Sequence, residues 1–482
     1  MTNIRSISIY LFLPLFFAVL SNLIYFDTDY FPVHDTLFQY QTFSVVYSHF
    51  FYTAEFPNWF PYVSFGQDST SWILFSIGPT QLILTVIGWL ANIENTLLLF
   101  NVSLTLDLVI FLTGSLLLIS TQTNNLKIFF FLTFVLSLLV FYDRQIFWNF
   151  KIYIAMPYLM YGAVRLFKNH ELISGLFGAN IFILYQFGNI SYASIPILYV
   201  VIIFSFFMYW MYILYPKTSH ISFLKNIFGC KKSFTLIIIL SIILCLLIYI
   251  LLGSVNDIKS NTEYIGAGRD SNTLKVNLNI FLNYGGLMFP SKFFEFLNGD
   301  PTSHSHDTLA YAGLLTIPLT IFGIIKGHEY RNFIIGLIIS NLFIICLSIP
   351  AFGVAKFLFN LPGMDNVRHI SYFLPLIKIS LLFSCALGLE TLSKNVKNIR
   401  FVIISIIVVT IISLLDPHLR ESFRDLIISK FLLCLILLLF IELNKNKEYI
   451  KIYTIITSVF VIDIISYRYL ITKSADMHLI KF

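Results

Sequence analysis

The stretch FTLIIILSIILCLLIYILLG, residues 234–253, decides the fold class of this chain because it contains no charged side chain. A similar run, FVIISIIVVTIISLL, occupies residues 401–415. A membrane core about 30 Å thick needs roughly 20 such residues in a helix. A helix also satisfies every backbone N–H and C=O without water. These runs therefore predict membrane-spanning helices.

The composition points the same way along the whole chain. Of 482 residues, 57% are hydrophobic and 12% are charged, and the mean hydropathy is +0.82. Soluble domains carry roughly 25% charged residues, so a soluble fold is excluded. The five cysteines are scattered without a C-x-x-C pair, which favours apolar packing over a metal site or a disulfide framework. We expect an all-α, polytopic transmembrane bundle forming a single membrane domain over 1–482, with membrane lipids as partners and no nucleic acid.

The apolar runs predict about thirteen spanning helices. The first is expected to be an uncleaved span, because no A-x-A-like cleavage site follows it. The predicted spans lie near 7–25, 96–120, 127–142, 151–166, 172–187, 193–214, 234–252, 308–326, 331–349, 371–391, 400–415, 426–442 and 450–467.

Segment 72–90 is apolar but contains Gly78-Pro79, which interrupts helical hydrogen bonding. It either crosses the membrane or enters and leaves on one side. If it does not cross and the N-terminus is cytoplasmic, nearly every basic loop falls on the cytoplasmic side, as the positive-inside rule requires. The charges therefore favour the non-crossing interpretation. Segments 26–95 and 253–307 then become long loops on the outer face.

Residues 35–54 of the first outer loop fit an amphipathic interfacial helix. Its apolar stripe consists of Leu37, Phe43, Tyr47 and Phe50, and its polar stripe of Asp35, Gln39, Thr42, His49 and Thr53. We expect the polar stripe to face solvent or a cavity. A partly shielded carboxylate near an acceptor hydroxyl can serve as a general base, and Asp35 is the candidate. The alternative is an acidic cap that faces water.

Several motifs resemble those of YfhO-like bacterial membrane proteins, which belong to the GT-C glycosyltransferase superfamily. In the first outer loop they are His34-Asp35, Pro57-Asn58-Trp59-Phe60-Pro61-Tyr62, Gly66 and Gly78-Pro79. Later ones are Tyr311-Ala312-Gly313-Leu314-Leu315, Leu361-Pro362-Gly363, Val367-Arg368-His369 and Gly388-Leu389-Glu390. One departure is that Arg368 lacks the second arginine of the family's pattern. The resemblance covers about residues 1–395.

The resemblance implies GT-C-like architecture in a bacterial cytoplasmic membrane, with a cytoplasmic N-terminus. It also implies a hexosyl- or pentosyltransferase that moves a sugar from a polyprenyl-phosphate donor to a glycan, lipid or protein acceptor on the outer face. Asp35 is then the catalytic base. The expected substrate-binding residues are His34, Trp59, Asp107, Arg269, Arg368 and His369. Arginine suits a phosphate because it binds bidentately; the alternative for each arginine is an anchor to lipid headgroups.

Three residues of the second outer loop, His304, His306 and Asp307, form a weak candidate site for a divalent metal such as Mg²⁺ or Mn²⁺. The alternative is an ordinary polar loop, because H-x-H-D has low specificity. Some GT-C enzymes use a metal and others use none, so the cofactor stays open.

Charges inside the predicted spans include Asp107, Lys378 and Asp463. Such charges are costly and usually face a cavity or a partner, and Asp107 and Lys378 are expected at comparable depths where they can pair. Two other functions remain open. A flippase or transporter would place charges near the midplane of corresponding halves. An O-antigen polymerase or ligase would use arginine and histidine from its outer loops.

Overall fold

The computed structural model describes an almost entirely helical chain, which confirms the all-α prediction. The described residues are 4–26, 32, 34–57, 59–60, 67–68, 77–142, 153–169, 171–186, 277–283, 297, 311–348, 353–360, 374–417, 419, 421–443 and 450–474. A first group of helices comes from the N-terminal part of the chain. It comprises α1 (Ile4–Asn22), the 3-10 turn η1 (Leu23–Phe26), α2 (His34–Thr53), α4 (Pro79–Leu90), α5 (Thr96–Ser120), α6 (Leu126–Tyr142), α8 (Met156–Asn169) and α9 (Leu172–Gln186).

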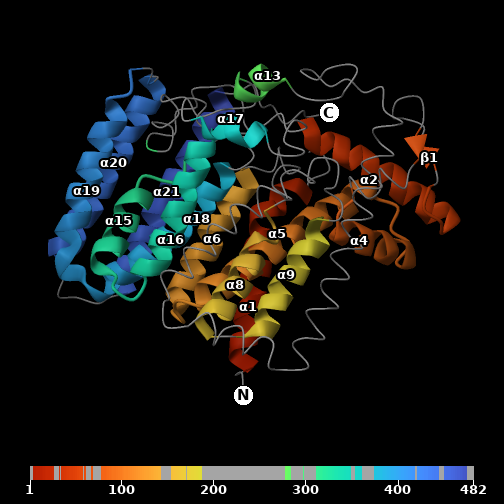
Figure 1. Ribbon diagram of the computed structural model, residues 1–482, viewed down its shortest axis with the longest axis horizontal. Helices are drawn as coiled ribbons and strands as arrows, with labels where there is room; N and C mark the ends of the chain where they lie inside the picture. Colours follow the sequence, from red (N-terminus) through yellow and green to blue (C-terminus); the bar gives the residue numbers. More distant parts are fainter. Residues whose placement is uncertain are drawn as a thin grey trace.

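A second group follows in the C-terminal part and lies beside the first (Figure 1). It comprises α15 (Thr316–Lys326), α16 (Arg331–Ser348), α18 (Leu374–Lys394), the 3-10 turn η7 (Val396–Asn398), α19 (Ile399–Leu414), α20 (Glu421–Leu443) and α21 (Ile450–Ser474). Two short helices, α13 (Leu278–Asn283) and α17 (Val354–Phe359), complete the described helices. One antiparallel ladder joins β1 (Trp59–Phe60) to β2 (Gln67–Asp68).

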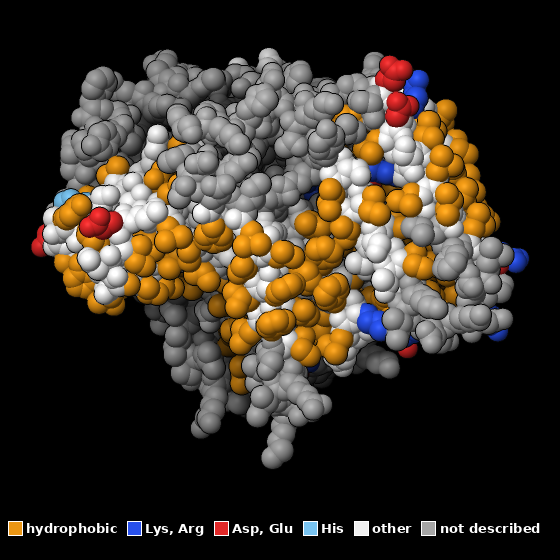
Figure 2. All heavy atoms as spheres, turned by 180° about the vertical axis from the view of Figure 1, so that it is seen from behind, with side chains coloured by type: hydrophobic (Ala, Val, Ile, Leu, Met, Phe, Trp, Pro, Cys, Tyr) orange, Lys and Arg blue, Asp and Glu red, His pale blue; other side chains and the backbone are white. Residues whose placement is uncertain are grey.

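Apolar helices indicate a membrane protein. Within the described part of the chain, three helices are long and apolar enough to cross a bilayer, at Thr96–Ser120, Leu376–Lys394 and Val396–Leu414, and several shorter apolar helices accompany them. Each predicted span contains a helix except 193–214 and 234–252, which lie outside the described residues. Hydrophobic side chains form a broad band across the described surface in Figure 2, whereas most visible charged side chains lie at its edges. The total of about thirteen crossings stays a prediction.

The two groups share one hydrophobic core, and α6 of the first group joins it to the second by packing on α18 and α21. The closest packing is between α15 and α18. A Cβ atom on Gly388 of α18 would come within 1.9 Å of the Leu319 carbonyl oxygen of α15. Small residues of this kind let membrane helices approach closely.

The basic loops gather at one end of the bundle. Lys394 at the end of α18 donates hydrogen bonds to Tyr330 and Glu329 in the loop before α16, at 2.8 and 2.9 Å. Arg331 donates to two carbonyl groups in the last turn of α15, and Arg400 pairs with Glu442 at 2.8 Å. This end of the bundle is called the basic end below.

Helix α2, which belongs to the segment expected to form the first outer loop, lies at the opposite end. Helix α2 contacts the start of α5, where Tyr40 shares a 3.1 Å hydrogen bond with Thr96. Because α5 continues from there for 25 residues, or roughly 38 Å, α2 and the basic end are separated by the length of a span. This separation agrees with the placement of 26–95 and the basic loops on different faces. The orientation in the membrane stays a prediction.

Helix α4 has 12 residues, a length of about 18 Å, because it starts only at Pro79 after the Gly78 cap. This length is short of a full span and is compatible with the non-crossing interpretation of 72–90. The expected span 308–326 is wrong at its start, because α15 begins at Thr316 and residues 311–315 are not an α-helix.

Candidate functional site

The expected catalytic residue Asp35 and its neighbour His34 form the first turn of α2, which confirms the predicted helix to within a residue at each end. Trp59 lies in β1, with its backbone paired to Asp68. The side chains of these three predicted residues are not described. Six further candidates lie outside the described residues, namely Arg269, His304, His306, Asp307, Arg368 and His369. No group of metal-ligating side chains occurs within the described residues.

Aromatic side chains attach α2 to the bundle. Phe43 and Tyr47 are completely buried, and Phe43 packs on Phe100 of α5. The Tyr47 hydroxyl donates a hydrogen bond to the Ile93 carbonyl in the turn before α5, and burial raises the pKa of Tyr47. The apolar stripe therefore packs α2 against α5 and the turn before it, and this packing positions the helix that carries Asp35.

The polar stripe of α2 divides into two halves. Gln39 and Thr42 are buried, 1% and 3% exposed, whereas His49 and Thr53 near the other end are exposed. Gln39 follows Asp35 by one helical turn and therefore lies on the same face. Among the described residues, neither polar atom of its buried amide has a hydrogen-bond partner. The half of the stripe next to Asp35 thus faces the molecule's interior, where a polar ligand could satisfy Gln39.

Asp107 is the one predicted site residue whose side chain is described, and it is 2% exposed. Thr80 in the first turn of α4 donates a hydrogen bond to Asp107 Oδ1 at 2.6 Å, and the Tyr185 hydroxyl of α9 donates to the same atom at 3.3 Å. The carboxyl group therefore joins three helices in the half of α5 nearer to α2. Lys378 is also buried, at 2% exposed, and its pairing with Asp107 stays a prediction.

A second buried carboxylate, Asp463 of α21, has a partner that the sequence interpretation missed. Lys430 of α20 forms an ion pair with it, and both side chains are at most 5% exposed. The Lys430 ammonium also lies 5.0 Å from the ring centroid of Tyr311 and 5.8 Å from that of Tyr467, which is cation–π distance. Lys430 is the only charged residue in 426–441. A single charge within an apolar run was therefore the sequence signal that could have identified Lys430 as a partner.

The motif Tyr311-Ala312-Gly313-Leu314-Leu315 wraps around this pair. The Tyr311 hydroxyl donates to Asp463 at 2.8 Å, and the Leu314 N–H donates at 2.7 Å. Gly313 has φ +106°, a conformation that costs a non-glycine residue energy, and its missing Cβ leaves room for Phe460. The motif is therefore a docking turn for Asp463, and this explains why α15 starts later than expected.

The motif Gly388-Leu389-Glu390 also has a structural role. Gly388 permits the close approach of α15, and the buried Glu390 lies 3.6 Å from the Lys394 ammonium. The hydrogen bond from Lys394 lowers the pKa of Glu329, and burial raises the pKa of Tyr330 to about 12. Glu390 thus belongs to the basic end and lies away from α2.

Two buried polar clusters therefore stand out in the described part of the chain. In the Lys430–Asp463 cluster, the carboxylate has its own counterion and hydrogen-bond donors and holds the start of α15 in place. The Asp107 cluster joins α5 and α4, which both pack against α2, to α9. No protein-family model matches the chain, and no curated protein or solved structure matches it either.

Proposed function

We propose that this chain is a multi-pass glycosyltransferase of the GT-C type in a bacterial cytoplasmic membrane. It transfers a sugar from a polyprenyl-phosphate donor to a glycan, lipid or protein acceptor on the outer face. The observation that carries the proposal is the position of His34-Asp35. They start a helix fixed at the end of the bundle opposite the basic end, beside helices that carry the buried Asp107.

The chemistry requires few groups. Asp35 takes the proton of the acceptor hydroxyl, whose oxygen attacks the anomeric carbon of the sugar. The bond from that carbon to the phosphate oxygen breaks, and polyprenyl phosphate leaves with the electron pair. In this proposal Arg368 and Arg269 stabilise the charge that develops on the phosphate.

The family motifs support the proposal indirectly. Two of them, around Gly313 and Gly388, have definite structural roles here, since both fix the position of α15. His34, Trp59, Asp107 and His369 are then the further residues that bind the sugar or the acceptor.

The test uses membrane vesicles that contain the full chain, supplied with polyprenyl-phosphate sugars labelled in the sugar. Label entering the glycan, lipid and protein fractions is measured. Asp35→Asn is expected to lower transfer by at least about 100-fold, with unchanged protein amount and melting temperature. Asp29→Asn, a carboxyl group in the same loop, is the matched control and keeps activity. Wild-type transfer by Asp35→Asn would remove Asp35 from this role.

A second candidate, a flippase for lipid-linked glycans, is favoured by one observation. Charged side chains are buried within both helical groups, at Asp107 and at Lys430–Asp463, and transporters place charges there. The same vesicles separate the two functions. Movement of an intact lipid-linked glycan across the bilayer, with no label transferred from any donor, would replace the transferase proposal.

A further inference from the structure

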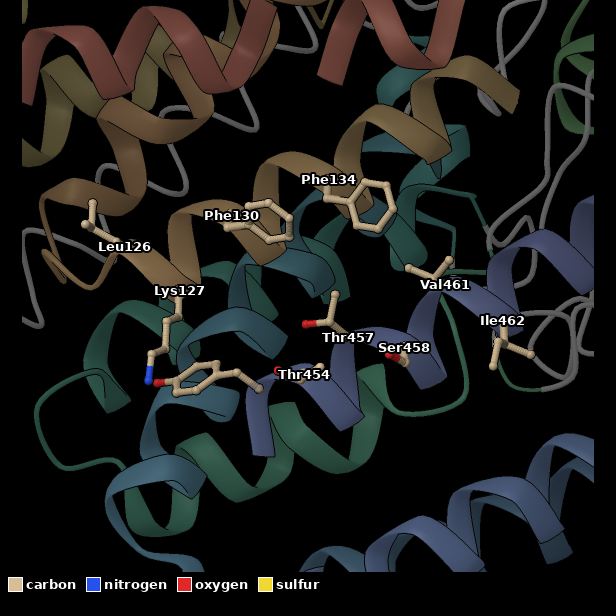
Figure 3. Close-up of a pocket in the computed structure, with 10 residues that line it drawn as sticks. Leu126, Lys127, Phe130, Phe134, Thr454, Thr457, Ser458, Val461 and Ile462 are labelled. Atoms are coloured by element: carbon tan, nitrogen blue, oxygen red, sulfur yellow. The ribbon is translucent and has the colours of Figure 1, made fainter. Parts of the chain in front are cut away.

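A groove of about 720 Å³ lies between α6 and α21. Figure 3 shows Phe130 and Phe134 of α6 facing Thr457 and Ser458 of α21 across it. Phe130 and Ile462 are each 45% exposed, so the groove opens to the outside of the bundle. Its volume falls in the range of sites that bind small molecules, and its walls combine aromatic rings with hydroxyl groups.

Lys127 closes one end of the groove (Figure 3). Its ammonium lies 5.2 Å from the ring centroid of Tyr453. The Tyr453 hydroxyl is held by Asn125 at 2.9 Å and by Ser393 at 2.7 Å. Among the described residues, no carboxylate lies within ion-pair distance of Lys127. A rigid ring therefore supports a cation whose charge has no acidic partner in this part of the structure.

The position of Lys127 suits a lipid headgroup. Ser393 precedes Lys394 at the basic end, so the Lys127 end of the groove belongs to the same end of the bundle. From Tyr453 the groove follows α21 to Ile462, which is nine residues or roughly 14 Å. One leaflet of a membrane core about 30 Å thick has nearly this depth. The groove thus matches an acyl chain in length and a phosphate in charge.

We propose that this groove binds a single anionic phospholipid, with its phosphate against Lys127 and one acyl chain between α6 and α21. The hydroxyl groups of Thr457 and Ser458 can donate hydrogen bonds to its ester carbonyl groups. Charge complementarity selects an anionic lipid over a zwitterionic one. The Lys127 end of this site lies at the opposite end of the bundle from α2, so it is separate from the helix that carries Asp35.

The test measures lipid bound to the purified full chain by native mass spectrometry after exchange into phosphatidylglycerol or phosphatidylcholine with identical acyl chains. One lysine near an anionic headgroup corresponds to about a fivefold preference. Wild type should therefore retain phosphatidylglycerol about fivefold better, and Lys127→Gln should abolish that preference. Lys326→Gln, at an exposed lysine of the basic end outside the groove, should leave it unchanged. Free glycerol phosphate should not compete, because it lacks the acyl chain.

A second pair of variants tests the acyl-chain part of the groove. Ser458→Phe fills the groove and should lower retention of both lipids at least about fivefold. Ile465→Phe, at a 52% exposed residue of the same helix outside the groove, should change nothing. Any one of three results would overturn the proposal. The first is equal retention of the two lipids by wild type, and the second is an unchanged preference in Lys127→Gln. The third result is full lipid retention in Ser458→Phe with a wild-type melting temperature.

Discussion

Removing the charge of Asp463 tests whether its buried ion pair holds the second helical group together. In Asp463→Asn the amide oxygen can still accept from Leu314 N–H, so the substitution chiefly removes the negative charge beside Lys430. That ammonium then stays buried, 5% exposed, without its counterion. Breaking a buried pair in this way costs about 3–5 kcal/mol.

The expected change in melting temperature follows from this cost. One kcal/mol shifts the melting temperature of a domain of roughly 150–250 residues by about 2–4 °C, and of a larger chain by less. For a chain of 482 residues, we therefore expect Asp463→Asn to melt about 3–5 °C below wild type. A thiol-reactive dye is a suitable reporter because Cys434, one turn after Lys430 on α20, is 1% exposed and reacts only after α20 opens.

Two comparisons separate this effect from a general loss of charge. Glu329→Gln removes an ion pair with Lys394 whose acidic side chain is 70% exposed, and such surface pairs contribute at most about 1 kcal/mol. Combining Lys430→Met with Asp463→Asn removes the uncompensated cation. The double variant should therefore recover at least half of the decrease in melting temperature that Asp463→Asn causes. A single variant that melts with wild type, or a double variant no better than the single one, would refute the reasoning.

Two further substitutions test the packing and the Asp107 cluster. Gly388→Ala should lower the melting temperature strongly, because its Cβ would lie 1.9 Å from a carbonyl oxygen of α15. Gly175→Ala is the control and should change the melting temperature little, because the nearest neighbour of its Cβ would lie at 3.4 Å. Equal melting temperatures for the two variants would contradict the close packing at Gly388. Thr80→Val removes the 2.6 Å hydrogen bond to Asp107 and should cost about 1.5–3 kcal/mol. Thr85→Val removes only a bond to its own helix and serves as its control.

Much of the helical framework follows from the sequence. The run 96–120 was predicted to the residue, because a long apolar segment in lipid must satisfy its backbone groups within itself. The apolar and polar stripes predicted the helix that starts at His34-Asp35. The distribution of basic residues predicted that this helix and the basic loops lie on different faces. Aromatic and polar positions repeat with the helical period, so the stripes of α2 were also visible in advance.

Contacts between distant segments were decided only by the tertiary structure. Asp463 pairs with Lys430 of the neighbouring helix α20. The same carboxylate accepts hydrogen bonds from Tyr311 and Leu314, which lie 152 and 149 residues away in the sequence. No local periodicity encodes such a partner, which is why the start of α15 was misplaced. The burial of Gln39, the Thr80–Asp107 bond and the groove beside Lys127 likewise depend on how helices pack. The sequence determined which segments are helical and which residues carry charge, because hydrophobicity and backbone hydrogen bonding act locally. Packing decided which charges meet, because a buried charge must find its counterion wherever the fold places it.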